Sequence, residues 1–337
     1  MGSVVQLKQK VNDSYNDLRI ISENKLSLVD EKIKTKLESD VGLIHEMVKY
    51  HLKSGGKRLR ALLTLGSSKL CGYSNGLRDV NLAACVELIH CATLLHDDVI
   101  DQSELRRGKK TTNKIWGNQS SILVGDYLFS RSFEMMVEDG DIEILKLLSS
   151  TSSTIAQGEV LQSQHSNEID ILEETYLKII NSKTAALFSA ATKVGGIITK
   201  RTDKEKNALE FYGKNLGLTF QIADDTLDYN SNINLFGKKI GKDFFEGKVT
   251  LPAILVYQES NFNEKQSIKK MFSQKTRSNE ELDYILKLIK KYNIINACYK
   301  KAEHFINLAS NSLGVFRPSN EKAILKNLTS FSLQRSF

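Results

Sequence analysis

Two groups of aspartates could carry out chemistry in this sequence. Asp97-Asp98-Val-Ile-Asp101 and Asp224-Asp225-Thr-Leu-Asp228 both have the pattern D-D-x-x-D, and each follows an apolar run that is typical of a helix. Residues four apart share one face of a helix, so the outer aspartates of each group should project together. Crowded carboxylates repel one another, whereas Mg²⁺ accepts oxygen ligands from one or two carboxylates and from substrate phosphates. The pair of groups predicts a cavity that holds a diphosphate through several Mg²⁺ ions.

A single acidic cluster at a helix end is more often a solvated surface or a cap than a metal site. The repeated pattern favours the metal site, and other residues support it: Gly55-Gly56-Lys57-Arg58-Leu59-Arg60, Arg106-Arg107-Gly108, Lys183-Thr184, Phe220-Gln221 and Gly237-Lys238. With these residues the chain resembles the trans-isoprenyl diphosphate synthases. It is most similar to their long-chain all-trans polyprenyl branch, of the octaprenyl type, from about residue 40 to the C-terminus.

The resemblance implies a role for each acidic and polar residue. Asp97 and Asp101 would be the main Mg²⁺ ligands with Asp98 close by, and Asp224 would hold another ion. The aspartates that follow it would orient waters and lysines. The implied catalytic set is Asp97, Asp98, Asp101, Asp224, Asp225, Lys183, Thr184 and Gln221, and the implied metal-binding set is Asp97, Asp98, Asp101, Asp224 and Asp228.

The basic residues are assigned to two substrates by the same resemblance. The implied site for isopentenyl diphosphate is Gly56, Lys57, Arg60, His90 and Arg107, and the implied site for the allylic diphosphate is Arg106, Lys183, Thr184, Gln221, Lys238 and Lys248. His90 lies seven residues before Asp97 and so on nearly the same helix face, although a lone histidine on an apolar helix is usually a core residue. His96 is rotated off that face and is interpreted as structural. Ala61 stands where the family usually has proline.

Composition sets the fold class. Of 337 residues, 41% are hydrophobic, 26% are charged and only two are proline, which suits a helical chain with a sizeable core. We expect an all-α fold, a single helical bundle over residues 1–337 with a central apolar cavity, in which Ser103–Thr112 and Gly237–Gly247 are loops. The resemblance implies the isoprenoid synthase fold. Expected helices include 142–165, 173–193 and 204–228.

Several classes of protein are excluded by the same survey. No apolar run of about 20 residues spans a membrane, and the first residues lack the apolar stretch of a signal peptide. The formal charge of +7 comes from scattered lysines without interleaved aromatics, so nucleic acid is not an expected partner. Cys71, Cys85, Cys91 and Cys298 form no metal-binding spacing, so we expect reduced thiols and a cytoplasmic protein. At most, the protein would touch a membrane peripherally to release its product.

The length of the product should be set below the first aspartate group. Short-chain relatives commonly have bulky aromatic residues just before this group, whereas Ala92 and Thr93 are small and would let a growing chain pass. Four residues of the next helix could form the channel floor, with ordinary core packing as the alternative for each: Phe129 and the candidate chain-length residues Phe133, Met135 and Met136.

The predicted function is Mg²⁺-dependent condensation of isopentenyl diphosphate onto an allylic prenyl diphosphate by a homodimer. The product would be a long all-trans polyprenyl diphosphate, with quinone side chains as its destination. A short-chain farnesyl or geranylgeranyl diphosphate synthase is one alternative. A non-catalytic subunit of a heteromeric synthase is another, although such subunits typically lose one aspartate group. A terpene cyclase is a third, and the basic residues of the isopentenyl site speak against it.

Overall fold

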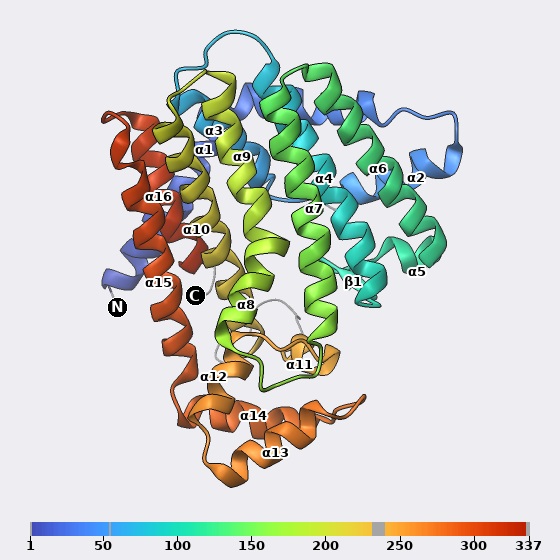
Figure 1. Cartoon of the computed structure of the whole chain (residues 1–337), viewed down its shortest axis with the longest axis vertical. Coiled ribbons are helices and arrows are strands. Elements are labelled where there is room, and N and C mark those ends of the chain that lie inside the picture. Colours follow the sequence, from blue (N-terminus) through green and yellow to red (C-terminus); the bar gives the residue numbers. More distant parts are fainter. Residues whose placement is uncertain (1, 54, 231–239, 335–337) are drawn as a thin grey trace.

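The computed structural model describes residues 2–53, 55–230 and 240–334, and most of the described chain is helical (Figure 1). The first ten α-helices are α1 (Gly2–Lys36), α2 (Gly42–Lys53), α3 (Leu59–Leu70), α4 (Arg78–Ile100), α5 (Thr112–Trp116), α6 (Asn118–Asp139), α7 (Ile142–Gln164), α8 (Glu173–Ile180), α9 (Ala186–Ile198) and α10 (Asp203–Asp228). The chain continues as α11 (Lys242–Glu246), α12 (Leu251–Glu259), α13 (Phe262–Phe272), α14 (Asn279–Lys291), α15 (Ile294–Ser312) and α16 (Asn320–Gln334), with a 3₁₀ turn η2 (Leu313–Val315) before α16. The all-α prediction is confirmed.

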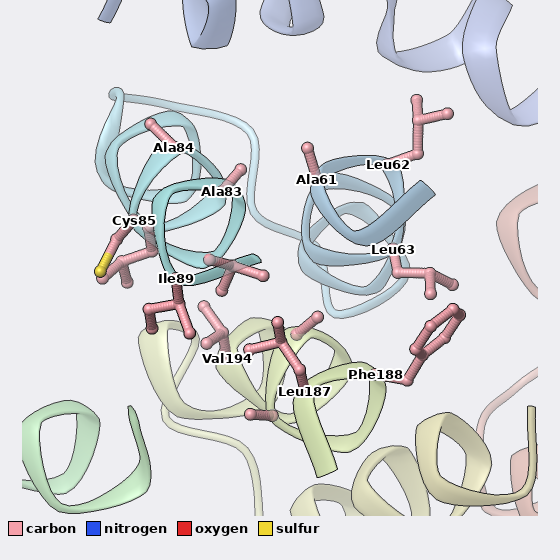
Figure 2. Packing of buried hydrophobic residues seen from close by; sticks show 14 of the residues in the cluster. Ala61, Leu62, Leu63, Ala83, Ala84, Cys85, Ile89, Leu187, Phe188 and Val194 are labelled. Atoms are coloured by element: carbon pink, nitrogen blue, oxygen red, sulfur yellow. The ribbon is translucent and has the colours of Figure 1, made fainter. Parts of the chain in front are cut away.

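The larger hydrophobic core lies where α3, α4 and α9 pack together (Figure 2). Leu63, Ile89 and Leu187 come from these three helices and are almost fully buried. Gly195 allows α9 to approach α3 closely, since a Cβ at this position would stand 2.5 Å from the carbonyl carbon of Ser67. The helix α4, which ends in the first aspartate group, packs against both α3 and α9.

A second core joins α12, α14 and α15, and α10 links the two cores. Tyr212 and Leu216 on α10 belong to the first core, whereas Leu218 and Ile222 belong to the second. Figure 1 shows α13 and α14 as a layer at the lower end of the molecule, beyond α12. No helix among the described residues has the length and apolar character needed to cross a membrane.

The segment 103–112, expected as a loop, contains a small hairpin. Strand β1 (Leu105–Arg106) pairs antiparallel with β2 (Lys109–Lys110), and the turn residues Arg107 and Gly108 have φ values of 53° and 76°. Two left-handed residues in a two-residue turn match the twist of a hairpin. Because of this turn, the side chains of Arg106 and Arg107 point in different directions, towards Asp98 and Gly56 respectively.

Two further expectations of local structure are corrected. The expected helix 173–193 is broken by a π-helix, η1 (Asn181–Ala185), and its last part runs on to Ile198. The expected loop 237–247 contains the short helix α11, which begins after the left-handed Gly241. Hydrophobic periodicity does not report a π-turn, because one extra residue only shifts the phase of the apolar face.

Candidate functional site

The first aspartate group lies at the C-terminal end of α4. The side chains of Asp97 and Asp101 are 15% and 16% exposed. Asp97 has one buried carboxylate oxygen, Oδ1, without a hydrogen-bond partner, while Lys183 Nζ lies 3.7 Å from the other. Asp101 accepts a hydrogen bond of 2.6 Å from Lys248. Two carboxylates on one helix face are thus partly neutralised by two ammonium groups.

Asp98 differs from its neighbours because it is turned away from them and buried. Its carboxylate accepts from Arg106 through Nη2 at 2.8 Å and Nε at 3.0 and 3.1 Å, which engages both oxygens. Asn113 donates to the backbone carbonyl of Asp98 at 3.2 Å. The sequence prediction placed Asp98 among the metal ligands, whereas in the structure its carboxylate anchors Arg106. A residue adjacent to Asp97 is rotated by about 100° around the helix, which explains the difference.

The second aspartate group at the end of α10 shows the same division. Asp224 is exposed, whereas Asp225 is buried and accepts hydrogen bonds of 2.7 Å from Tyr176 Oη and from Gln221 Nε2. Burial raises the pKa of Asp225 to about 7, against the lowering effect of these two bonds. Gln221 in turn accepts from Thr184 Oγ1 at 2.7 Å. Asp225 therefore fixes the orientation of a polar pair, Gln221 and Thr184.

A chain of contacts brings the two groups together. Asp228 Oδ2 accepts from the backbone N–H of Asp243 at 2.8 Å, and the carbonyl of Asp243 accepts from the N–H of Lys248 at 2.9 Å. The side chain of Lys248 then reaches Asp101. The prediction that the two groups face one site agrees with this link between α10 and α4.

Lys183 occupies the π-helix η1 and reaches into the same region. Its ammonium donates to Glu159 at 2.8 Å and to Gln162 at 2.9 Å, besides its contact with Asp97. Burial, followed by the charge of Asp97, raises the pKa of the Glu159 carboxyl to about 7. Lys183 and the adjacent Thr184 both lie in this π-turn, where Lys183 contacts Asp97 and Thr184 contacts Gln221.

The donor atoms suit an open Mg²⁺ site. Asp97, Asp101 and Asp224 offer carboxylate oxygens, and the unpaired Oδ1 of Asp97 is a buried acceptor in need of a cation. Within the described ranges, no three His, Cys, Asp or Glu side chains already converge on one point as a closed cage. Mg²⁺ does not require such a cage, because waters and substrate phosphates usually complete its octahedron. The residues present therefore fit the ion.

A cluster of basic side chains, which we call the basic pocket, gathers around His90, two turns before Asp97 on α4. Arg60 Nη1 lies 3.0 Å from His90 Nε2, and the guanidinium stacks on the ring of Phe188 at 4.6 Å. Arginine only donates, so Nε2 accepts and His90 is the neutral tautomer with its proton on Nδ1. Burial first, and then the nearby cations, lower the pKa of His90 well below its usual range. The Nε of Arg60 is buried without a partner, and burial lowers the pKa of this arginine to about 10.

Arg107 and the glycine-rich loop meet at the edge of this pocket. The guanidinium of Arg107 lies so close to Gly56 that a Cβ there would stand 2.8 Å from Nη1. Lys57 is exposed, and its carbonyl accepts from Tyr15 Oη at 2.8 Å. The structure thus brings Gly56, Arg60, His90 and Arg107 to one region, as predicted. Lys238 lies outside the described residues.

Sequence reasoning missed Glu87, which organises the basic pocket. This buried carboxylate accepts from the backbone N–H of Ala61 at 3.0 Å and from Arg58 Nη1 at 3.3 Å. Arg58 has a left-handed φ of 47° and also pairs with Asp30 of α1 at 3.1 Å. A proline at position 61 has no N–H, so the bond to Glu87 depends on the residue by which this chain departs from the family pattern. The sequence feature that could have identified Glu87 is its position three residues before His90, on the same helix face.

The candidate chain-length residues lie in different surroundings. Thr93 is half-buried on the face of α4 that carries His90 and Asp97. Ala92 is fully buried on the face that carries His96. That face points towards α6, because Nε2 of His96 lies 3.2 Å from the carbonyl oxygen of Ile122. Met135 and Met136 are buried in the first core. Phe133 is 41% exposed and lines a surface depression with Ser130, Glu134, Val137 and Glu138. In the single chain Phe133 therefore does not form a buried channel floor, because its position on α6 faces outward.

Comparisons with known proteins agree with this geometry. A family model described as polyprenyl synthetase matches residues 41–289. The chain is 38% identical over 307 residues to the octaprenyl diphosphate synthase of Escherichia coli (strain K12), covering 91% of this chain and 94% of that one. It is also 34% identical to a geranylgeranyl diphosphate synthase of Saccharolobus solfataricus, with 96% and 99% covered.

Solved structures resemble the fold closely. The crystal structure of a decaprenyl diphosphate synthase from Rhodobacter capsulatus has a TM-score of 0.92 and 37% identity, covering 96% of this chain and 99% of that chain. A polyprenyl synthase from Caulobacter crescentus CB15, complexed with calcium and isoprenyl diphosphate, has a TM-score of 0.91 and 37% identity, with 96% and 98% covered.

Proposed function

We propose that this protein makes a long all-trans polyprenyl diphosphate with the help of Mg²⁺. The chain belongs to the polyprenyl synthetase family and is a trans-prenyl diphosphate synthase. The observation that supports this most strongly is the contact between Lys248 and Asp101, because it links the end of α4 to the segment that Asp228 contacts through Asp243. Near the end of α4 lies Arg60, a half-buried cation whose hydrogen-bond partner is a neutral histidine. An acidic half and a basic half fit two diphosphate substrates.

The acidic half would bind the allylic diphosphate. When bound, Mg²⁺ supplies positive charge that stabilises the leaving diphosphate. Asp97, Asp101 and Asp224 would hold the ions, and Lys183 and Lys248 would turn from carboxylates towards phosphate oxygens. Arg106, fixed by Asp98, would present its remaining N–H donors to the same diphosphate.

The basic half would hold isopentenyl diphosphate so that its double bond meets the allylic carbon. Lys57, Arg60, His90 and Arg107 would bind the phosphates without metal. As the allylic C–O bond breaks, the double bond attacks the cation, and a proton is then lost to the departed diphosphate. Thr184 and Gln221 hydrogen-bond each other, so their oxygens can stabilise the cation while being held away from attacking it.

Small residues before Asp97 on α4 support the proposal that the product is long. Thr93 lies on the face of Asp97 one turn deeper, and a small side chain there leaves room for a growing chain. Relatives of this chain include both octaprenyl and geranylgeranyl diphosphate synthases, so a short-chain product is the second candidate. We place the protein in the cytoplasm and assign its product to quinone side chains.

A homodimer is part of the proposal. The outer face of α6 exposes Leu123, Phe133 and Val137 at 59%, 41% and 66% of their surface, spaced to lie on one side of the helix. A second copy that covers this face would bury these apolar side chains and close the depression beside Phe133. Light scattering should give twice the chain mass, and Val137→Asp should lower it.

One assay tests the function directly. Purified protein is incubated with Mg²⁺, labelled isopentenyl diphosphate and an allylic primer, and the products are separated by chain length. Long polyprenyl diphosphates are expected. Products that stop at three or four isoprene units would assign the chain to the short-chain class instead, and no product in the presence of both substrates would contradict the enzyme.

A further inference from the structure

His51 lies near the end of α2, outside every set of residues discussed so far. The preceding residue, Tyr50, donates to the carbonyl of Lys110 at 2.7 Å, and Lys109 donates to the carbonyl of Lys53 at 3.0 Å. These two bonds hold the end of α2 against the β1–β2 hairpin. His51 is half-buried and stands in the chain between these two anchors, so it lies next to the hairpin that carries Arg106 and Arg107.

Three arginine charges act on this imidazole. Burial, followed by the charges of Arg106, Arg107 and Arg58, lowers the pKa of His51 to about 4. His90, on α4, is close enough to be affected by His51 in the same way. Arg106 and Arg107 act on His51 from the hairpin, and Arg58 acts on it from the glycine-rich loop. On α4, His90 is neutral and the carboxylate of Glu87 is paired with Arg58, so His51 is a neutral side chain among more cations than anions.

Positive charge gathered in this way favours the binding of an anion. A diphosphate would screen the arginines, and its negative charge would favour the protonated imidazole, which donates a charge-assisted hydrogen bond. The same pocket contains Arg107, Arg60 and His90, which form the proposed isopentenyl diphosphate site. We propose that His51 is a further ligand of the diphosphate of isopentenyl diphosphate, bound beside Arg107. This inference rests on the proposed function.

Kinetics with two histidine variants test the role of His51. His51→Asn removes the titratable ring, and His45→Asn is the matched control, because His45 is an exposed residue of the same helix. The KM for isopentenyl diphosphate should rise roughly tenfold in His51→Asn, as expected for one lost charged hydrogen bond. The KM for the allylic primer should stay within twofold in both variants. Equal KM values for isopentenyl diphosphate in the two variants would overturn the proposal.

Calorimetry provides a readout that does not depend on turnover. Inorganic diphosphate is titrated into the protein at pH 7 in two buffers of different ionisation enthalpy, which gives the number of protons taken up. The wild type and His45→Asn should take up more protons than His51→Asn. Identical uptake in all three proteins would show that His51 does not face the anion. This difference can be seen even if the chain makes no polyprenyl product, so failure of the proposed function is distinguished from failure of this inference.

Folding is checked by melting temperature before either experiment. If His51→Asn does not fold, His51→Gln replaces it. If neither variant folds, the wild type is titrated with sulfate, whose charge is constant between pH 5 and 8. His90→Gln is titrated in the same way, so that His51 is left as the titrating histidine of the pocket. Binding to His90→Gln that tightens as the pH falls supports the proposal, and binding to it that does not change with pH overturns the proposal.

Discussion

The ammonium group of Lys248 lies 2.6 Å from the carboxylate of Asp101, although 147 residues separate them in sequence. Lys248 also pairs with Glu246 at 3.0 Å, so it stands between two carboxylates. This ion pair joins the end of α4 to the segment that follows α10. Binding of Mg²⁺ to Asp101 would compete with Lys248 and release its ammonium group towards the diphosphate.

Removal of either aspartate group should abolish the reaction. Asp97→Ala or Asp224→Ala is expected to reduce kcat by several orders of magnitude, because each loses a carboxylate that holds Mg²⁺. Steady-state rates are measured over a range of Mg²⁺ concentrations. Asp203→Ala is the control, since Asp203 lies on the same helix as Asp224 with its side chain 94% exposed. Undiminished turnover in excess chelator, or in either active-site variant, would contradict a metal-dependent mechanism.

The two arginines of the hairpin should differ in kinetic effect. Arg107→Ala removes a cation beside Gly56 and should raise the KM for isopentenyl diphosphate at least tenfold, with little change for the primer. Arg106→Ala also leaves the buried Asp98 unpaired and should mainly affect the allylic substrate. Lys110→Ala, an exposed change in the same hairpin, serves as the control. If each arginine variant weakened both substrates equally, the division of the site would be wrong.

Glu87 should matter for both stability and substrate binding. Glu87→Ala leaves Arg58 without one of its carboxylate partners and leaves the N–H of Ala61 without an acceptor. Loss of one partner of a buried ion pair typically costs about 3 kcal/mol, which urea unfolding can measure. Glu87→Gln keeps a hydrogen-bond acceptor and should be milder. The KM for isopentenyl diphosphate should rise in both, and a variant with normal stability and normal KM would show that Glu87 is dispensable.

The sequence allowed prediction of the parts of this site that follow helical spacing. Asp97 and Asp101 share a face because they are four residues apart, and His90 lies two turns earlier. The structure agrees with the all-α class and with helices that end in the two aspartate groups. The bond of Asp98 to Arg106 was not predictable, because it depends on a two-residue turn that rotates one arginine away from the next. The role of Glu87 was not predicted, because a single glutamate within an apolar helix belongs to no recognised sequence motif.

The stability of the protein should depend on pH through the basic pocket. The pKa of His51 is lowered to about 4 in the folded protein, below its usual value near 6.5. Between these values the unfolded chain binds a proton that the folded chain does not, so stability is lost as the pH falls from 6.5 towards 4. At pH 5.5 this one group costs about 1 kcal/mol.

The loss of folding stability at low pH is measured by urea unfolding at pH 7.5 and 5.5, for the wild type and for His51→Asn. The variant should lose less stability over this interval, and inorganic diphosphate should reduce the loss in the wild type more than in the variant. His45→Asn should behave like the wild type. If His51→Asn and the wild type lost the same amount, His51 would not be the group that titrates.

Product length should respond to the two small residues before Asp97. Replacing Ala92 or Thr93 with Phe places a rigid ring one to one and a half turns below the metal site, where the growing chain should meet it after a few additions. The chemistry lies above this point, so turnover should continue while the product shortens on a chromatogram. Thr93→Ser, which keeps the small size and the hydroxyl, is the control and should leave the product unchanged.

Ala92→Phe and Thr93→Phe should differ in their effect on the stability of the fold. Ala92 is fully buried on the face of α4 that packs against α6, so its replacement should overpack that interface and lower the melting temperature. Thr93 is half-buried on the site-facing side, and its hydroxyl bonds only to the carbonyl of His90 in its own helix at 2.8 Å, so Thr93→Phe should melt nearer to the wild type. A Thr93→Phe protein that is folded and active but still makes full-length product would show that the chain does not pass this face of α4.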